Sequence, residues 1–178
     1  KNFAKTFPSH PKTELAYYMV GYCHYLESPS YSLDQAYTYK AINDLQLFAN
    51  LYPNSDKLLS TNELIDELRA KLEKKSFERA MQYFHMEYYQ SAVVGFNNVI
   101  DDYPDTEFRE EAMYYKLLAA YRLAENSISE KKLQRFIEGR TAYLEFKESF
   151  PDSQYLIEVN KLYTGIDQII SNIKNSAS

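Results

Sequence analysis

Four prolines stand in the same short frame, and this recurrence constrains the fold more than any other feature of the chain. In each copy an aromatic residue precedes the proline and small polar residues follow it: Phe7-Pro8-Ser9, Tyr52-Pro53-Asn54-Ser55, Tyr103-Pro104-Asp105-Thr106 and Phe150-Pro151-Asp152-Ser153. Proline disfavours the α conformation in the residue before it and therefore ends an incoming helix. The polar residues after it can accept hydrogen bonds from the free N–H groups of the next helix. Each frame therefore predicts a helix-to-helix corner, although the first copy has its hydroxyl one residue early.

Between these corners, apolar residues recur at steps of three and four, which is the period of an amphipathic helix. The 178 residues include only 4 Gly and 6 Pro, too few for a turn-rich β fold. No stretch has a competing strand pattern. We expect an all-α chain, with one unusually long helix from Lys57 to Phe84 and a final helix from about Gln154 to Lys174.

Some local patterns predict where helices begin and which side they bury. Ser32 with Gln35, and Ser127 with Glu130, have the spacing of capping boxes and predict helix starts. Residues of the helix before the second corner follow the steps of one helical face, which is flanked by Ile42, Leu45 and Phe48: Ala36, Tyr39/Lys40, Asn43, Leu47 and Leu51. A basic run on the long helix is expected to be a solvated face: Arg69, Lys71, Lys74 and Lys75.

Charge and composition exclude several classes of function. The chain has 20 Lys and Arg against 25 Asp and Glu, a net charge of −5, so it lacks the basic footprint of a nucleic-acid-binding protein. No apolar stretch approaches the roughly 18 residues of a membrane span. The single cysteine, Cys23, excludes an internal disulfide and a cysteine-based zinc site. Because His10, His24 and His85 are dispersed and no Gly-rich phosphate loop exists, we expect a protein without cofactor, metal or catalytic site.

The middle repeat resembles the tetratricopeptide signature. Its matching residues lie at offsets 0, 3, 12, 16, 19 and 24: Ala80, Tyr83, Ala92, Phe96, Val99 and Pro104. Small residues at these positions let two helices approach closely, and the aromatic residue fills the groove beside them. The flanking repeats match less closely and carry insertions at Glu27–Asp34 and Ala124–Leu133.

The resemblance implies a single right-handed α-solenoid of about three helix-pair repeats and a C-terminal helix. Its expected parts are the end of a preceding repeat (1–10), three repeats (12–53, 56–104 with the long first helix, and 106–151), and a terminal helix with a tail (153–178).

Within this superfamily, the chain resembles the outer-membrane assembly lipoproteins of the BamD (YfiO) type. The supporting stretches are Phe7-Pro8-Ser9-His10-Pro11, Ala16-Tyr17-Tyr18-Met19 followed by Gly21, Leu51 to Ser55, Leu68 to Leu72, and Ala92-Val93-Val94 running to Asp102-Tyr103-Pro104-Asp105-Thr106. The resemblance implies a non-enzymatic scaffold at the periplasmic face of the bacterial outer membrane. Its implied partners are the periplasmic domains of the barrel subunit of the assembly machinery, bound largely by C-terminal repeats, and unfolded β-barrel substrates, bound by N-terminal repeats. The family's lipid anchor is on an N-terminal cysteine. Cys23 lies inside a predicted helix and cannot be that residue, so we expect the anchor to lie outside this chain.

Two sets of residues are candidates for these contacts. Exposed charges near corners and the second insertion form a predicted docking surface: Asp101, Asp102, Arg122, Glu125, Lys131, Lys132 and Arg135. Tyrosines beside the signature positions are predicted groove aromatics, because aromatic side chains bury much area at low entropy cost: Tyr18, Tyr22, Tyr88 and Tyr115. For the tyrosines, the competing interpretation is packing between repeats.

Other functions stay open at this point. A Tol-associated periplasmic scaffold shares the Tyr-Pro-x-Ser corner but lacks the very long helix before the third corner. A generic peptide-binding adaptor that clamps a C-terminal carboxylate needs Lys, Arg and Asn on successive first helices, and Glu14–Tyr25 has none. An enzyme would require a paired acid–base site or a cofactor.

Overall fold

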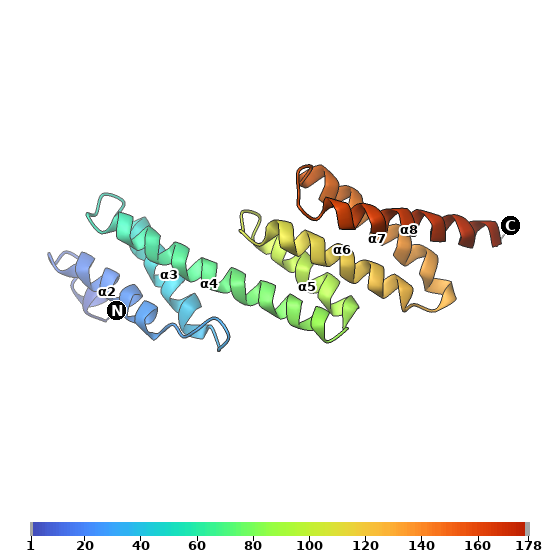
Figure 1. Ribbon diagram of the computed structural model, residues 1–178. Coiled ribbons are helices and arrows are strands. Elements are labelled where there is room, and N and C mark those ends of the chain that lie inside the picture. The colour runs from blue at the N-terminus through green and yellow to red at the C-terminus, as the bar shows by residue number, and fades with distance from the viewer. Residues whose placement is uncertain (1, 177–178) are drawn as a thin grey trace. The chain divides into compact units, whose positions relative to one another are not determined.

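The computed structural model describes residues 2–176, without the side chains of Lys5, Lys174 and Ser176, and this part of the chain contains helices but no strands. The helices are α1 (Asn2–Thr6), α2 (Thr13–Glu27), α3 (Ala36–Leu51), α4 (Leu58–His85), α5 (Tyr89–Asp102), α6 (Arg109–Glu125), α7 (Ser129–Ser149) and α8 (Leu156–Ser176) (Figure 1). The all-α prediction is confirmed, and so is the long helix, since α4 has 28 residues. The end of the predicted tail, residues 177–178, lies outside the described residues.

The chain forms two compact units, residues 1–75 and 76–178, with α4 running through the boundary. In the first unit, α1 packs on α2, and α2 on α3. In the second unit, α5, α6, α7 and α8 pack one on the next in antiparallel order (Figure 1). Helix α6 also contacts α8, so helices one repeat apart stack on each other. This arrangement is that of a tetratricopeptide-like helical solenoid.

Three of the four proline frames fold into nearly the same corner. The aromatic residues Tyr52, Tyr103 and Phe150 end their helices with φ between −130° and −135° and ψ between 63° and 71°. In each corner the residue two after the proline donates its N–H to the aromatic residue's carbonyl, at 3.1 to 3.2 Å. Its hydroxyl then accepts the N–H two residues later, at 3.0 to 3.3 Å. The hydroxyl therefore closes the turn before the helix, whereas the sequence predicted a cap on the helix itself.

The first corner uses a histidine where the others use a hydroxyl. The N–H of His10 donates to the carbonyl of Phe7 at 3.1 Å, and its ring Nδ1 accepts the N–H of Lys12 at 3.1 Å. The corner is therefore regular, although Ser9 stands one position too early to close it.

Both predicted capping boxes are wrong. Helix α3 begins at Ala36, whose N–H donates to Asp34 Oδ1 at 2.9 Å. The Gln35 side chain instead donates to carbonyls of the preceding loop. Helix α7 begins at Ser129, and the hydroxyl of Ser127 donates back to the carbonyl of Leu123. The side-chain hydrogen bonds of both predicted caps are therefore used to order the insertions.

Two helix pairs pack so closely that only a glycine fits at the contact. A Cβ on Gly21 would lie 2.7 Å from Leu45 Cδ2 and 3.0 Å from the Leu45 backbone nitrogen, between α2 and α3. A Cβ on Gly95 would lie 2.9 Å from Ala80 Cβ and 3.2 Å from its Cα, between α4 and α5. Close contact of small residues is what the signature predicted.

The signature residues Ala80, Ala92, Phe96 and Val99 are fully buried. Tyr83 is the exception: it is 36% exposed, and Phe84 instead packs against the core of the second unit. The predicted filling of the groove by Tyr83 is therefore wrong.

The helical face traced by the sequence period of α3 is exposed, and the residues that flank it are buried. Tyr39, Leu47 and Leu51 are exposed, and so are Ala36, Lys40 and Asn43. The buried face is one step round the helix and consists of Thr38, Ala41, Ile42, Asp44, Leu45 and Phe48. Two of these are polar: the Thr38 hydroxyl lies 2.7 Å from the Ser28 hydroxyl, and Asp44 Oδ2 lies 2.9 Å from His24 Nδ1.

We expect Gly95→Ala to destabilise the protein by about 1–3 kcal/mol, because the new methyl group meets the backbone of Ala80, which no rotamer change relieves. The matched control is Gly165→Ala in α8, where a Cβ meets nothing within 4 Å. That change should stabilise the protein by up to about 1 kcal/mol, because alanine favours the helix. Urea unfolding followed by circular dichroism measures both, and a Gly95→Ala variant as stable as the control would refute the close contact.

Candidate interaction surfaces

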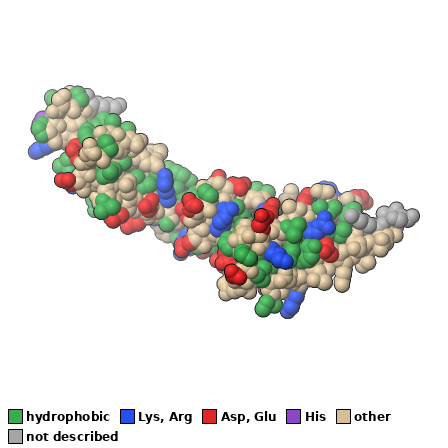
Figure 2. Space-filling model, turned by 90° about the horizontal axis from the view of Figure 1, so that it is seen from above, with side chains coloured by type: hydrophobic (Ala, Val, Ile, Leu, Met, Phe, Trp, Pro, Cys, Tyr) green, Lys and Arg blue, Asp and Glu red, His purple; other side chains and the backbone are tan. Residues whose placement is uncertain are grey.

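The predicted docking residues fall into two groups at opposite ends of α6. Asp101 and Asp102 are the exposed last residues of α5. The other five surround the short connection between α6 and α7, residues 126–128. Because α6 has 17 residues and a helix rises 1.5 Å per residue, the groups are separated by about 25 Å. They do not form one continuous patch, and acidic and basic side chains are interspersed on the face seen in Figure 2.

Around the α6–α7 connection, some charged residues are available to a partner and one holds the connection in place. Arg122 Nη1 lies 3.0 Å from Glu125 Oε2, and the Arg122 side chain is 57% exposed. Arg135 instead donates from Nη1 to the Ser127 hydroxyl at 2.5 Å, which holds the connection in place. We define the connection surface as Arg122, Glu125, Ile128, Lys131 and Lys132. Ile128, which is 63% exposed at the tip, was missed from the sequence, although a lone apolar residue in a polar break was a signal.

A groove that the sequence did not reveal lies over α6, between α5 and α7. Its volume is about 320 Å³, and its apolar lining includes Val93, Ala120 and Leu123. Lys116 of α6 spans it to Glu145 of α7, with 3.0 Å between Nζ and Oε2. The groove is open because α5 and α7 both pack on α6, while the contacts among the described helices include none between α5 and α7.

Two of the predicted groove aromatics form a ladder along α2. Tyr18 stacks on Tyr22 with 5.8 Å between ring centroids, and Tyr22 stacks on Tyr25 at 6.0 Å. At one end of the ladder the Tyr25 hydroxyl donates to Glu67 of α4 at 2.6 Å, and at the other end Lys57 Nζ, from the residue before α4, lies 5.1 Å from the Tyr18 ring centroid. We call Tyr18, Tyr22 and Tyr25 the tyrosine ladder.

The other two predicted aromatics have different environments. Tyr115 stacks on Phe96 at 6.0 Å and meets Phe84 edge-on at 5.2 Å, within the core of the second unit. It therefore packs between repeats, as the competing interpretation stated. Tyr88 is 57% exposed in the turn before α5.

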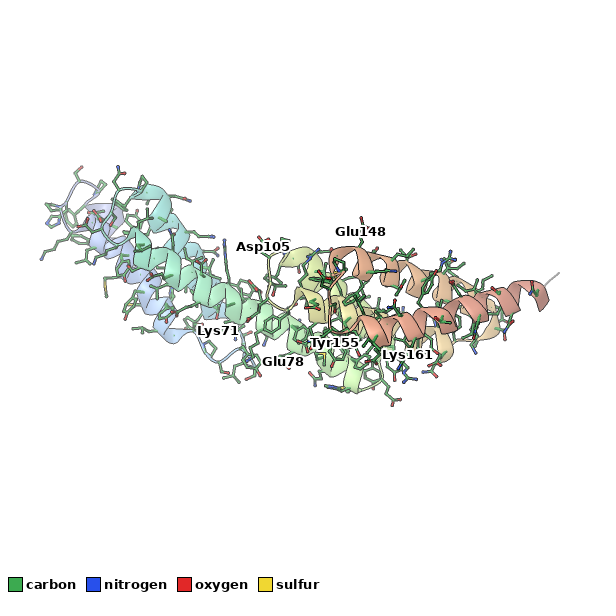
Figure 3. The ribbon with its side chains drawn as sticks, turned by 45° about the horizontal axis from the view of Figure 1, so that its top comes forward. Lys71, Glu78, Asp105, Glu148, Tyr155 and Lys161 are labelled. Carbon is green, nitrogen blue, oxygen red and sulfur yellow. The ribbon has the colours of Figure 1, made fainter. Side chains whose placement is uncertain are left out.

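Three lysines of the basic run on α4 contact the first insertion and hold it in place. Lys75 Nζ donates to the carbonyls of Tyr31, Ser32 and Leu33 at 3.1, 3.3 and 2.6 Å. Lys71 Nζ donates to the Ser28 hydroxyl at 2.7 Å (Figure 3). A further cation–π contact places Lys74 Nζ 4.9 Å from the Tyr31 ring centroid. Arg69 and Lys74 are exposed, whereas Lys71 and Lys75 are half-buried, so the prediction of a solvated face is wrong for Lys71 and Lys75.

Where α6 meets α8, tyrosines pack beside carboxylates. Tyr114 stacks on Tyr155 with 4.1 Å between ring centroids; Figure 3 labels Tyr155. Burial raises the pKa of Tyr114 strongly, and a hydrogen bond to Glu158 and the charge of Glu158 raise it further. Burial and the negative charge of Glu111 also raise the pKa of Tyr155. These hydroxyls therefore stay protonated and neutral next to negative charge.

Among residues 2–176, no group of three or more His, Cys, Asp or Glu side chains is placed to hold a metal ion. The helices of this same part of the chain include none that is long and apolar enough to cross a membrane.

A comparison with protein families matched residues 1–136 to YfiO, a family described as outer membrane lipoprotein. The chain belongs to the YfiO family. No curated protein matched it. The family match runs through both units and ends in the first part of α7. It includes all of the predicted docking residues and groove aromatics, whereas α8 and most of α7 lie beyond it. Its description associates this family with the outer membrane.

In this YfiO family member, we expect Lys75→Met to loosen the first insertion, since three carbonyls lose a charged donor while the long side chain keeps its volume. Hydrogen bonds to charged groups are worth about 1.5–3 kcal/mol when buried, and Lys75 is half-buried. Hydrogen exchange should show faster exchange in residues 31–36. Arg69→Met on the same helix is the control and should leave this segment unchanged; equal exchange in the two variants would contradict the fastening role.

A second prediction concerns alkaline pH. An unfolded tyrosine ionises near pH 10, whereas the native Tyr114 keeps its proton to higher pH. Above pH 10 the unfolded state therefore binds fewer protons than the native state, and stability falls as pH rises. Tyr114→Phe should lower the free energy of unfolding at pH 8, because the hydrogen bond is lost. Above pH 10, however, the free energy of unfolding of this variant should fall less steeply with pH, by up to about 1.4 kcal/mol per pH unit.

Urea unfolding at pH 8, 10 and 11 measures that slope. The control is Tyr88→Phe, at an exposed ring outside the core, and it should retain the slope of the unmodified chain. If Tyr114→Phe also retains that slope, Tyr114 is not the group responsible.

Proposed function

We propose that this chain is a non-enzymatic scaffold of the outer-membrane β-barrel assembly machinery, lipid-anchored at the periplasmic face of the outer membrane in its full-length form. The observation that carries the proposal is the YfiO match over residues 1–136, which runs through both units. Solenoid proteins present extended surfaces on which other proteins dock, and this favours a scaffold over a catalyst.

The connection surface is the proposed docking site for the periplasmic domains of the barrel subunit. Charges of both signs there, the exposed Arg122 and Lys131 and the half-buried Glu125, would orient a partner, and Ile128 would supply an apolar anchor at their centre. This combination of an apolar centre and a charged rim is typical of protein interfaces. Asp101 and Asp102, about 25 Å away along α6, would belong to a separate contact of the same partner or of another one.

The tyrosine ladder is the proposed site for unfolded β-barrel substrates. Its rings are half-buried, so each keeps one side available to a second aromatic or aliphatic group. Stacked aromatic pairs add about 0.5–1.5 kcal/mol beyond the area that they bury. Tyr88 is exposed and belongs to the second unit, and Tyr115 packs in the core of that unit.

The proposal is tested by calorimetric titration of the chain with purified periplasmic domains of the barrel subunit from the same organism. Arg122→Glu combined with Lys131→Glu should weaken binding about tenfold or more, because reversed charges repel the partner at an interface. The double reversal should change the free energy of unfolding only slightly, because an exposed i,i+3 ion pair is worth under about 1 kcal/mol. Arg135→Glu is avoided because Arg135 holds the connection.

The matched control is Lys161→Glu, an exposed charge on α8 (Figure 3), which should bind like the unmodified chain. If the double variant binds as tightly as the unmodified chain, the docking site lies elsewhere on the chain. An absence of binding at high micromolar concentration would contradict the role in barrel assembly and favour a Tol-associated scaffold.

A further inference from the structure

Helix α5 has an exposed side without any charge. From Tyr89 to Ile100 the chain contains no Asp, Glu, Lys, Arg or His, although 25% of all its residues are charged. Ala92, Phe96 and Val99 occupy the buried side. The exposed side presents two amides, a hydroxyl and an apolar side chain: Gln90, Ser91, Val94 and Asn98. Depletion of charge distinguishes the centre of protein interfaces from the remaining surface.

Beside this exposed side, a hollow of about 490 Å³ lies between α5 and the second half of α4. Ala80 and Gly95 form its floor, and because they are small the hollow is deep where the two helices cross. Its walls come from Arg79 and Tyr83 on α4 and from the uncharged residues of α5. All of these residues belong to the second unit.

The polar groups in this hollow have no partner in the protein. Within the described part of the chain, the side chains of Arg79, Gln90, Ser91 and Asn98 make no hydrogen bond or ion pair. Val94 is 54% exposed and Tyr83 is 36% exposed beside them. The hollow therefore combines unused donors and acceptors with apolar contact area.

The chemistry of these groups selects one kind of occupant. Each amide of Gln90 and Asn98 offers both donors and an acceptor, which match the alternating C=O and N–H groups of an extended peptide. The backbone of a helical segment could not bind these amides, because its N–H and C=O groups are already paired within the helix. Arg79 is the one charged side chain in the lining, and no carboxylate lies there to neutralise it. An acidic side chain on the peptide would complete the contact with a charge-assisted hydrogen bond.

We propose that the α4–α5 hollow binds an extended polypeptide segment that carries one acidic side chain. Gln90 and Asn98 bind its backbone, Val94 and Tyr83 contact its apolar side chains, and Arg79 binds its carboxylate. This site is distinct from the connection surface and from the tyrosine ladder, and it stands whether or not the role in barrel assembly holds.

The probe is a capped seven-residue peptide of alternating threonine and valine with aspartate at its centre, titrated into the isotope-labelled 178-residue chain and followed by amide NMR shifts. We expect saturable shifts in residues 79–83 and 90–98. A peptide with asparagine in place of aspartate should bind about tenfold more weakly. Arg79→Gln should weaken binding of the aspartate peptide by the same factor and leave the asparagine peptide unchanged.

The matched control is Arg69→Gln, an exposed arginine on the same helix in the first unit, which should bind both peptides normally. A capped alanine-rich helical peptide with one aspartate should give no saturable shift. The proposal is overturned by an absence of saturable shifts in these residues at millimolar peptide. It is equally overturned by an Arg79→Gln effect of the same size on both peptides, or by equal binding of the helical peptide.

Discussion

The rest of the structure depends on how closely paired helices approach each other. At Gly21 the neighbouring backbone of Leu45 leaves no room for a methyl group, and at Gly95 the same is true of Ala80. Such contacts bring two helices together with few side chains between them, so the layers are thin. Rings then fill the space between successive pairs, as where Phe77 stacks on Phe108 with 4.8 Å between centroids. Thin layers suit tyrosine, whose ring packs while its hydroxyl reaches water or a carboxylate.

The sequence was sufficient to predict the helices and corners, because these depend on local chemistry. Proline restricts the residue before it whatever the tertiary context, and Tyr52, Tyr103 and Phe150 accordingly share almost the same backbone angles. The role of His10, which closes the first corner where a serine or threonine hydroxyl closes the others, was not predictable in the same way. Its ring nitrogen can accept the N–H of Lys12 only once the turn has formed.

What the sequence could not predict depends on contacts between distant residues. The sequence period along α3 follows its exposed side, with Tyr39, Leu47 and Leu51, whereas the buried side includes Thr38 and Asp44, which have hydrogen-bond partners on other segments. Lys75 of α4 binds carbonyls more than forty residues earlier in the chain. For the candidate site, sequence proximity grouped charges that the length of α6 separates, and the groove between α5 and α7 leaves no pattern in the sequence.

Comparison of the second helices of two successive repeats shows why the outer side of α5 is unusual. Helices α5 and α7 occupy equivalent positions, each packing one side on α6. On α7 the exposed positions include Glu138, Glu145, Lys147 and Glu148, as expected for a solvated helix; Figure 3 labels Glu148. Each helix buries one side against its neighbours, and burial of that side does not explain the loss of charge on the exposed side of α5. A requirement for contact with another polypeptide explains it, because charged side chains at the centre of an interface lose hydration that the contact does not replace.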